Sequence, residues 1–268
     1  MRRLSQIFIY PVKGLKGISL DEALIDNTGL QYDRRWMLVD ETGTFMSQRT
    51  HPIMASFKLV QTEMGFDIWE PKAKECIAIP KLVTGSKVTV KIWNDTCEVV
   101  SYSKFADAWF STFLEMKCKL VYMPDDCNRA VETEFNRGSD TVSFADAYPI
   151  LLIGDESMAD LNNRLNTPVN IDRFRPNLVF TGGTAFEEDT YSEFSIGSHH
   201  FLAARPCGRC KVPGVNQQTG KPDKAGKELL KTLAKYRTQN NKVYFGQNVL
   251  SNGGSGIVKL GDALVNIY

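Results

Sequence analysis

The sequence predicts an α+β fold rich in β structure, in which barrel-like sheets are flanked by helices. Short runs of β-branched and aromatic residues recur along the 268 residues, separated by Gly, Pro, Asn and Asp. Between Lys87 and Trp93 polar and apolar residues alternate, as in a strand with one buried face. Only about three segments show the apolar spacing of a helix. Together these patterns favour barrel-like β structure decorated by helices.

The first half of the chain is predicted to be mostly strand. Its first strand runs from Leu4 to Tyr10, and a turn with two glycines and two lysines, residues 11–17, ends it. Asn94-Asp95 is expected to form a hairpin turn. The further strands expected in this half are 20–25, 36–39, 44–47, 55–61, 66–69, 87–93 and 96–100.

Three helices are predicted. The first begins after a Ser103 N-cap, the second begins at Ser157 with Asp160 in an imperfect capping box, and the third is a lysine-rich surface helix near Tyr236. We assign their apolar stripes to the core rather than to a cofactor site. These stripes are Phe105, Trp109 and Phe113; Met158, Leu161 and Leu165; and Leu229, Leu233 and Tyr236.

A domain boundary is predicted near residue 126. The segment from Cys127 to Asp140 has little periodicity and many polar residues, which is typical of a connection between domains. The predicted domains are therefore residues 1–125 and 126–268. The second contains further predicted strands at 150–153, 196–204, 244–250, 257–260 and 263–267.

The overall charge argues against two classes of partner. Lys and Arg number 32 against 31 Asp and Glu, so the chain has no global positive field for nucleic acid or an anionic membrane. The longest apolar stretch, near Pro149 to Ile153, is too short to span a bilayer. The strand pattern at the N-terminus leaves no room for a targeting peptide. We therefore expect a cytoplasmic protein.

The most reactive feature is the Cys207-Gly208-Arg209-Cys210 loop, which follows an apolar run that reads as a strand. A neighbouring guanidinium favours the thiolate, which attacks electrophiles and binds soft metals. Metal ligation, redox exchange and sulfur transfer all fit, and so does a pair of thiols that merely packs at a strand end. The other cysteines are irregularly spaced, which favours reduced thiols over disulfides. A structural zinc site would need a second pair of cysteines.

Two basic clusters elsewhere are candidate anion sites. Lys13 and Gly14 lie in the first turn, where glycine lets a backbone approach a ligand, although lysines in a turn are often simply solvated. Arg173 and Arg175 would share one face of an extended chain and could grip a phosphate or carboxylate. Pairing with nearby carboxylates such as Asp172 is the alternative for this second cluster.

Five motifs occur in an order that resembles the MOSC-domain family, in the branch with an N-terminal β-barrel subdomain that includes the mitochondrial amidoxime reducing component and its bacterial relatives. The resemblance covers nearly the whole chain. It implies a MOSC-type β-barrel core with flanking helices. The motifs are Tyr10-Pro11-Val12-Lys13; Asp33-Arg34-Arg35-Trp36; Arg173-Phe174-Arg175-Pro176-Asn177; the Cys207 to Cys210 loop with Thr219-Gly220; and Phe245-Gly246-Gln247.

The resemblance also implies a molybdenum cofactor, a pterin whose two dithiolene sulfurs bind molybdenum together with one protein cysteine. By alignment that cysteine is Cys210, which would be both metal ligand and catalytic residue. Pyridoxal phosphate binding is a further property that the family implies. The other positions that match the cofactor pocket are Lys13, Gly14, Arg34, Asp146, Ala147, Arg175, Asn177, Gly208, Arg209 and Asn248.

This chain departs from the reductase branch at two places. Gly14 stands where a hydroxyl residue is usual, and Pro213 to Asn216 replaces a Thr-Thr-Val-Asp run after Cys210. The resemblance implies reduction of small N-hydroxylated compounds with electrons from a separate iron–sulfur, flavin or haem protein, because no ferredoxin-like cysteine cluster follows the domain. The alternative is a sulfur carrier or cofactor-handling protein with a persulfide on Cys210.

Overall fold

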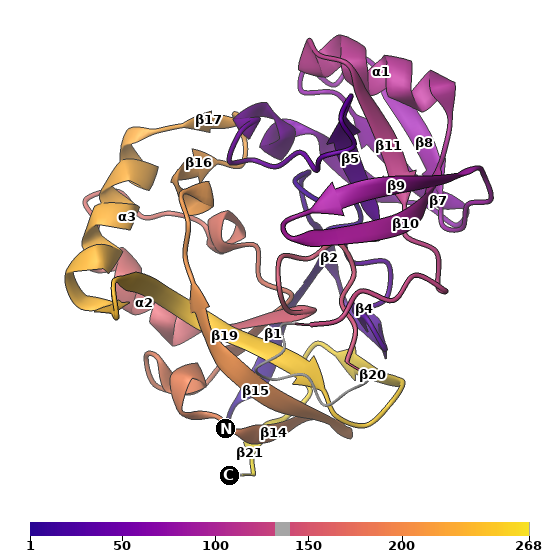
Figure 1. The fold of residues 1–268 in the computed structure, drawn as a ribbon. Helices are drawn as coiled ribbons and strands as arrows, with labels where there is room; N and C mark the ends of the chain where they lie inside the picture. The colour runs from indigo at the N-terminus through magenta and orange to yellow at the C-terminus, as the bar shows by residue number, and fades with distance from the viewer. Residues whose placement is uncertain (132–139, 268) are drawn as a thin grey trace.

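The computed structural model describes residues 1–131 and 140–267, so part of the predicted connection from Cys127 to Asp140 lies outside the described residues. The chain folds into two β-rich halves, one above the other in Figure 1, and this confirms the predicted α+β class. Sheets of short strands dominate both halves, and helices pack on their outer sides.

The larger sheet forms the lower half in Figure 1 and runs in the order β2-β1-β13-β12-β19-β15-β14-β21, with β18 paired to β19. Apart from the parallel pair β12 and β13, its neighbours are antiparallel. The strands are β1 (Arg3–Ile9), β2 (Ile18–Leu20), β12 (Ile150–Gly154), β13 (Leu178–Thr181), β14 (Glu193–Ile196), β15 (His199–Gly208), β18 (Thr238–Gln239), β19 (Lys242–Ser251) and β21 (Leu264–Asn266).

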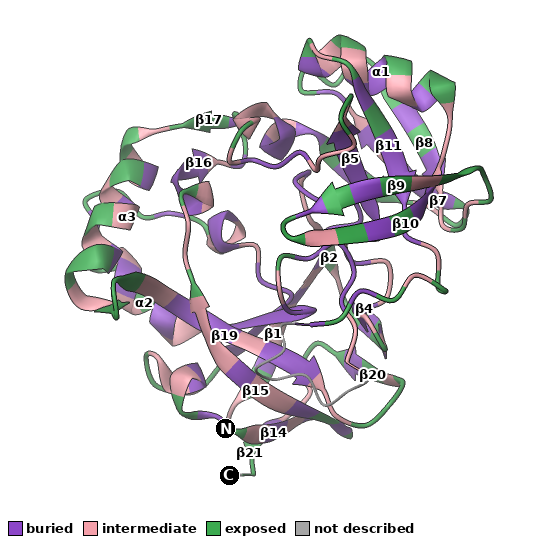
Figure 2. Ribbon diagram, in the orientation of Figure 1, coloured by how far each residue is buried: buried purple, intermediate pink, exposed green. Residues whose placement is uncertain are grey.

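Smaller sheets make up the upper half and the joint between the halves. The order β5-β11-β10-β9 forms one sheet and β6-β7-β8 another, while β20-β3-β4 and β16-β17 stand apart. Figure 2 shows buried and exposed residues alternating along β9. The strands are β3 (Glu22–Asp26), β4 (Gly29–Leu30), β5 (Trp36–Asp40), β6 (Lys58–Gln61), β7 (Gly65–Trp69), β8 (Cys76–Pro80), β9 (Lys87–Ile92), β10 (Asp95–Ser101), β11 (Cys118–Tyr122), β16 (Val215–Asn216), β17 (Lys221–Pro222) and β20 (Gly256–Lys259).

The helices cover the outer sides of these sheets. Ser103 caps the first helix as predicted, because its hydroxyl accepts from the backbone N–H of Phe105 and Ala106. Asp223 caps the third in the same way through Gly226 N–H. The α-helices are α1 (Lys104–Leu114), α2 (Asp155–Asn162) and α3 (Lys224–Tyr236), and the 3₁₀ helices are η1 (Pro52–Ser56), η3 (Ile171–Phe174), η4 (Glu187–Thr190) and η5 (Val212–Gly214).

Main-chain pairing crosses the predicted domain boundary. β1 pairs with β13, and β3 pairs with β20, so strands from the first 30 residues share sheets with strands from the second half of the chain. The division into 1–125 and 126–268 stays a prediction about sequence segments. The N-terminal strands nevertheless tie the two segments into a shared core.

Several strand predictions were wrong in detail. Residues 44–47 form only isolated bridges, and 20–25 is split between β2 and β3. Residues 55–61 begin inside η1, and β8 was not predicted. Ile92 pairs with Asp95, so the hairpin turn is Trp93-Asn94 rather than Asn94-Asp95. Short polar strands show only weak alternation of polar and apolar residues. Pairing with strands distant in sequence determines where they form.

Two helix predictions also need correction. Phe105 is 71% exposed, because each four-residue step on a helix advances by about 40° and leaves this residue at the edge of the stripe that buries Trp109 and Leu114. The second helix begins at Asp155, and Ser157 lies inside it. The Ser157 hydroxyl donates to the buried Glu188 carboxylate instead of forming a capping box.

Candidate functional site

A pocket of about 750 Å³ opens between the paired strands β15 and β19 and the loops of the N-terminal half. All eleven residues predicted from the sequence line it, although their roles stay predictions. They are Lys13, Gly14, Arg34, Asp146, Ala147, Arg175, Asn177, Gly208, Arg209, Cys210 and Asn248. Residues up to 235 positions apart in the chain therefore meet at one surface, as a folded binding site requires.

The arginine between the two thiols, Arg209, hydrogen-bonds to Cys207. Arg209 Nη1 donates to Cys207 Sγ over 3.0 Å, and its Nη2 donates to the Phe174 carbonyl over 2.7 Å. The Arg209 N–H donates to the Val243 carbonyl, which ties the loop to β19. Arg209 thus holds the loop through Cys207.

The cation beside Cys210 is Arg49, which sequence reasoning missed. Arg49 lies beside Cys210 in the pocket and pairs with Asp146, with Nη2 2.7 Å from Oδ2. Its guanidinium lies over the Trp93 ring, 4.5 Å from the centroid. Burial opposes the charge of Arg49, but attraction to Asp146 and Cys210 raises its pKa above the ordinary value.

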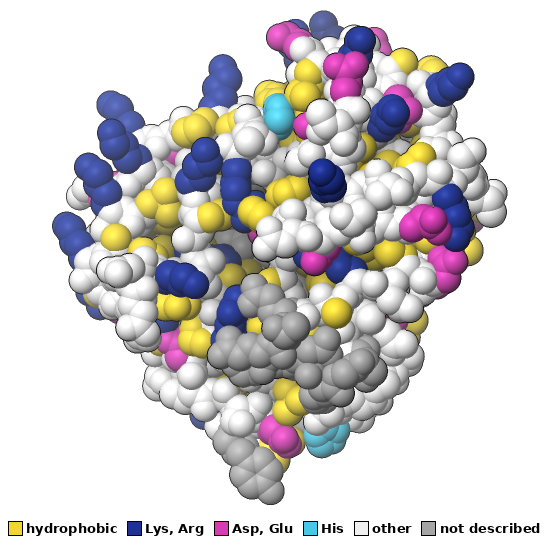
Figure 3. All heavy atoms as spheres, viewed as in Figure 1, with side chains coloured by type: hydrophobic (Ala, Val, Ile, Leu, Met, Phe, Trp, Pro, Cys, Tyr) yellow, Lys and Arg dark blue, Asp and Glu magenta, His cyan; other side chains and the backbone are white. Residues whose placement is uncertain are grey.

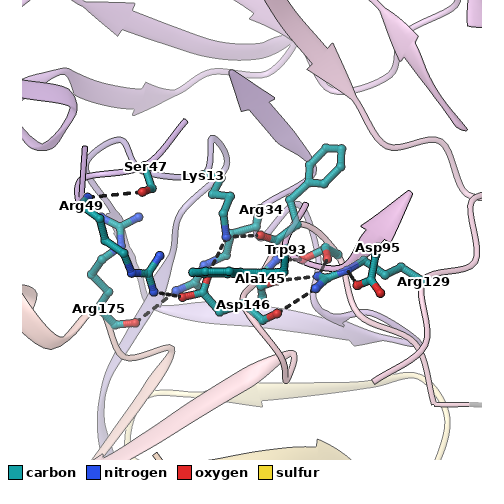
Figure 4. Close-up of polar contacts among 12 residues, drawn as sticks. Lys13, Arg34, Ser47, Arg49, Trp93, Asp95, Arg129, Ala145, Asp146 and Arg175 are labelled. Atoms are coloured by element: carbon teal, nitrogen blue, oxygen red, sulfur yellow. Dashed lines mark hydrogen bonds and ion pairs between the residues drawn. The ribbon is translucent and has the colours of Figure 1, made fainter. Parts of the chain in front are cut away.

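Asp146 is the centre of a polar cluster, and Figure 4 shows Lys13, Arg49 and Trp93 converging on it. Lys13 Nζ lies 2.6 Å from Asp146 Oδ1 and also donates to the Phe144 carbonyl. Although burial opposes ionisation, the charges of Lys13 and Arg49 hold the pKa of Asp146 well below its usual range. Burial lowers the pKa of Lys13 to about 8 against the pull of Asp146.

Arg129 fixes the loop that carries Asp146. Its guanidinium donates to the carbonyls of Ser143, Ala145 and Asp146, and its Nε pairs with Asp95 Oδ2 at 2.6 Å. Because Asp95 begins β10, this contact joins the loop to the N-terminal half. The pocket wall is therefore braced from both halves.

A second cluster surrounds the ring of Tyr10. The guanidiniums of Arg34 and Arg175 lie 4.4 and 4.1 Å from its centroid, and its hydroxyl donates to the Pro176 carbonyl. Arg34 also donates to Asp33 and to Asn177 Oδ1. Burial lowers the pKa of Arg175 to about 10, so it stays charged at neutral pH, and its Nη1 donates to the Leu15 carbonyl.

The predicted arginine fork does not form as expected. Residues 171–174 are the 3₁₀ helix η3, and Arg175 adopts the left-handed conformation, so the chain is not extended here. Arg173 pairs with Asp223 at 2.7 Å and also donates to the Pro213 carbonyl. Of the two arginines, Arg175 faces the Tyr10 cluster, while the charge of Arg173 is matched by a carboxylate.

Gly14 is required by the backbone. Its φ of +86° is left-handed, and a Cβ there would lie 2.7 Å from Met54 Cε. The same Cβ would lie 3.8 Å from the Cα of Ser47, which also lines the pocket. Ser47 therefore lies next to the first turn at the pocket wall.

Further lining residues were missed because their segments carry no motif. The run from Ser47 to Arg49 lies at the end of a predicted strand that does not form. Tyr148 and Arg205 lie just outside predicted strands, and Tyr244 begins one. The one available signal was the polar run Ser47-Gln48-Arg49 directly after the apolar Phe45-Met46. Only the fold shows that this run faces Cys210.

The chemistry of the pocket fits the molybdenum cofactor that the motifs imply. Among the described lining residues, eight are Lys or Arg and one is Asp. The Nε of Arg209 is buried without a hydrogen-bond partner, and Arg175 is a buried cation. This surplus of donors suits an anionic group such as a phosphate, and the Cys210 thiol suits a soft metal. In the described part of the chain, no three His, Cys, Asp or Glu side chains gather as metal ligands.

Comparison with known proteins agrees with the order of the motifs. Residues 1–117 match the MOSC N-terminal beta barrel domain, and residues 139–265 match the MOSC domain. The chain is 31% identical to mitochondrial amidoxime-reducing component 1 of Mus musculus, covering 87% of this chain and 71% of that protein. It is 30% identical to mitochondrial amidoxime reducing component 2 of Bos taurus over 87% of this chain and 72% of that protein.

A second group of relatives consists of molybdenum cofactor sulfurases. The chain is 32% identical to molybdenum cofactor sulfurase of Solanum lycopersicum, over 91% of this chain and 32% of that protein, so it spans about a third of the sulfurase's length. A crystal structure of the YuaD protein from Bacillus subtilis covers 98% of this chain and 94% of that chain, with 11% identity and a TM-score of 0.47. No helix in residues 1–131 or 140–267 is long and apolar enough to cross a membrane.

By its similarity to the amidoxime reducing components over most of both chains, and by the two domains in sequence, this chain belongs to the MOSC-domain family, in the branch with an N-terminal β-barrel domain.

Proposed function

We propose that this chain binds the molybdenum cofactor in the 750 Å³ pocket and reduces N-hydroxylated compounds such as amidoximes, hydroxylamines and N-hydroxylated bases. The observation that carries the proposal is the meeting of the Cys210 thiol with Lys13, Arg34 and Arg175 in one pocket. The similarity to amidoxime reducing components over most of both chains supports the same reaction class.

Each group of pocket residues would have a different chemical role. Cys210 would ligate the metal, while Lys13, Arg34 and Arg175, with Asn177, would hold the phosphate through charge-assisted hydrogen bonds of about 1.5 to 3 kcal/mol each. Asp146 orients Lys13 and Arg49, and Arg49 would place a positive charge beside Cys210. Further contacts to the cofactor would come from Gly14, Ala147, Gly208, Arg209 and Asn248.

When bound, the cofactor supplies two-electron reduction of the N–O bond. The substrate R–NHOH takes up two electrons and two protons, and the products are R–NH₂ and water. We propose that a separate iron–sulfur, flavin or haem protein provides the electrons. All six cysteines are free thiols, which supports a reducing compartment such as the cytoplasm.

The second candidate is a sulfur carrier or cofactor-handling protein, with a persulfide on Cys210. It is favoured by the 32 and 33% identity to molybdenum cofactor sulfurases. The basic pocket weighs against a pure carrier, because a persulfide alone does not need Lys13, Arg34 and Arg175.

Metal and pterin analysis tests the proposal. Protein from a host that makes the cofactor should contain molybdenum and pterin, Cys210→Ser should lose the molybdenum, and Cys207→Ser should keep it. Wild-type protein should then reduce an amidoxime with reduced methyl viologen. Labile sulfur on Cys210 without molybdenum would move the assignment to the sulfur carrier.

A further inference from the structure

The outer face of α3 carries a line of exposed lysines. Lys224, Lys227, Lys231 and Lys235 are three or four positions apart, so they lie on one side of the helix. The opposite side buries Leu229 and Leu233 in the core. Figure 3 shows the Lys and Arg side chains gathered over α3, and we call the four lysines the α3 basic face.

The neighbouring carboxylates offset this face only in part. Asp160 pairs with Arg164, and Asp223 pairs with Arg173. Glu228 accepts from the backbone N–H and the side-chain Nδ2 of the neutral Asn166, so its charge offsets one of the four lysines. All four lysines line a hollow of about 590 Å³ along the helix. In a chain whose net charge is +1, this is a local surplus of positive charge.

The α3 basic face lies directly behind the Cys210 loop. Its helix packs against η5, which begins at Val212, two residues after Cys210. The approach is so close that a Cβ on Gly226 would lie 2.3 Å from the Gly214 carbonyl oxygen. Pro213 of η5 lines the pocket itself. A protein seated on α3 would therefore be separated from the pocket by α3 and η5.

We propose that the α3 basic face is the docking site of an acidic electron-transfer protein, the donor on which the proposed function depends. Complementary charge would steer the encounter and orient the partner on this side of the pocket. Two reduced donors would each give one electron per turnover. Solvent supplies the two protons, and the amine and water leave.

The shape and charge of the surface favour a protein over other polyanions. α3 has 13 residues and is about 20 Å long, which matches a charged patch on a small protein. An anionic membrane would bind more stably if apolar side chains entered it, but the apolar face of α3 is buried. A longer nucleic acid would also meet acidic side chains beyond α3, because the chain carries almost as many acidic as basic residues.

Charge reversal on the holoenzyme tests the proposal. The variant Lys227→Glu/Lys231→Glu/Lys235→Glu is compared with Lys72→Glu/Lys74→Glu/Lys104→Glu, which makes the same charge change at exposed sites on the other half. The probes are two acidic donors, a plant-type ferredoxin and a flavodoxin, with reduced methyl viologen as a small donor. Binding of the oxidised ferredoxin is measured separately by calorimetry at low salt.

We expect at least one acidic donor to support turnover. The α3 variant should raise the KM for that donor and weaken calorimetric binding by at least about tenfold, while the control variant and the methyl viologen rate stay at wild-type values. The difference should vanish in about 0.5 M salt, where the Debye length is only a few ångströms.

Other outcomes overturn the proposal in distinguishable ways. If methyl viologen drives turnover but neither acidic donor does, or both triple variants behave alike, docking on α3 is wrong and the reductase function stands. If methyl viologen also fails with molybdenum-loaded protein, both proposals fall. Loss of binding to single-stranded RNA or phosphatidylserine vesicles in the α3 variant, with unchanged donor kinetics, would assign the face to another partner.

Discussion

Arg49 Nη2 lies 2.7 Å from Asp146 Oδ2, and this ion pair joins segments that are 97 residues apart in the chain. The same arginine lies over the Trp93 ring and beside Cys210. One side chain of the N-terminal half thus links the Asp146 loop to the thiol that would bind the metal. Different substitutions of Arg49 should therefore remove different contacts.

Replacement of Arg49 should weaken the pocket in two graded steps. Arg49→Lys keeps the charge but loses the planar stacking on Trp93, and we expect a loss of about 1 kcal/mol in unfolding free energy. Arg49→Gln also leaves Asp146 with less compensation and should lose about 1 to 3 kcal/mol. Urea denaturation measures both. Lys87→Gln removes an exposed ion pair with Glu98 and should lower the unfolding free energy by much less than either Arg49 substitution; an equal loss there would contradict the special role of Arg49.

Anion binding should depend on the protonation of Lys13. Because burial lowers its folded pKa to about 8, below the 10.5 usual for lysine, Lys13 loses its charge as the pH rises through 8. The affinity of cofactor-free protein for pyrophosphate should therefore fall above pH 8. Between about pH 8 and 10.5 the unfolded chain binds more protons at this residue, so its contribution to stability rises with pH.

Calorimetry with pyrophosphate from pH 7 to 9.5 measures the first effect, and thermal unfolding over the same range measures the second. Lys13→Arg should show no such fall in pyrophosphate affinity across this range, because arginine stays charged. A wild-type affinity that is independent of pH would show that Lys13 does not contact the anion.

The Tyr10 ring should matter more than its hydroxyl. Tyr10→Phe loses one hydrogen bond to the Pro176 carbonyl and should cost about 1 kcal/mol of stability. Tyr10→Leu also removes the ring beneath Arg34 and Arg175 and should cost about 2 to 4 kcal/mol. Anion affinity, measured by the same calorimetry, should fall only in the Leu variant. Equal losses in both variants would place the effect on the hydroxyl.

Gly226→Ala should destabilise the protein although alanine is the better helix former. The propensity gain is about 1 kcal/mol. The new Cβ would meet the Gly214 carbonyl at 2.3 Å, and relieving such a contact typically costs about 1 to 3 kcal/mol or more. The backbone atom cannot rotate away, so we expect a net fall in melting temperature. Ala234→Gly, at an exposed site of α3, should cost about 1 kcal/mol by propensity alone. A stabilised Gly226→Ala protein would show that α3 can move away from η5.

The sequence by itself determined the β-rich class, the Ser103 cap and the group of residues that line the pocket. The first two are local: alternation along β9 and a hydroxyl before α1 act within a few residues of the chain. The eleven pocket residues were found because the family motifs carry them in order, and spacing alone did not bring Lys13 and Cys210 together.

The tertiary structure alone decided which charge meets which partner. Arg209 is adjacent to Cys210 in sequence, yet its guanidinium bonds to Cys207 and Phe174, while Arg49 reaches Cys210 from the other half. Likewise Arg173 and Arg175 are two residues apart, but the turn at η3 sends one to Asp223 and the other to Tyr10. Side-chain direction depends on backbone conformation and on packing between distant segments, and neither is encoded in the local spacing of residues.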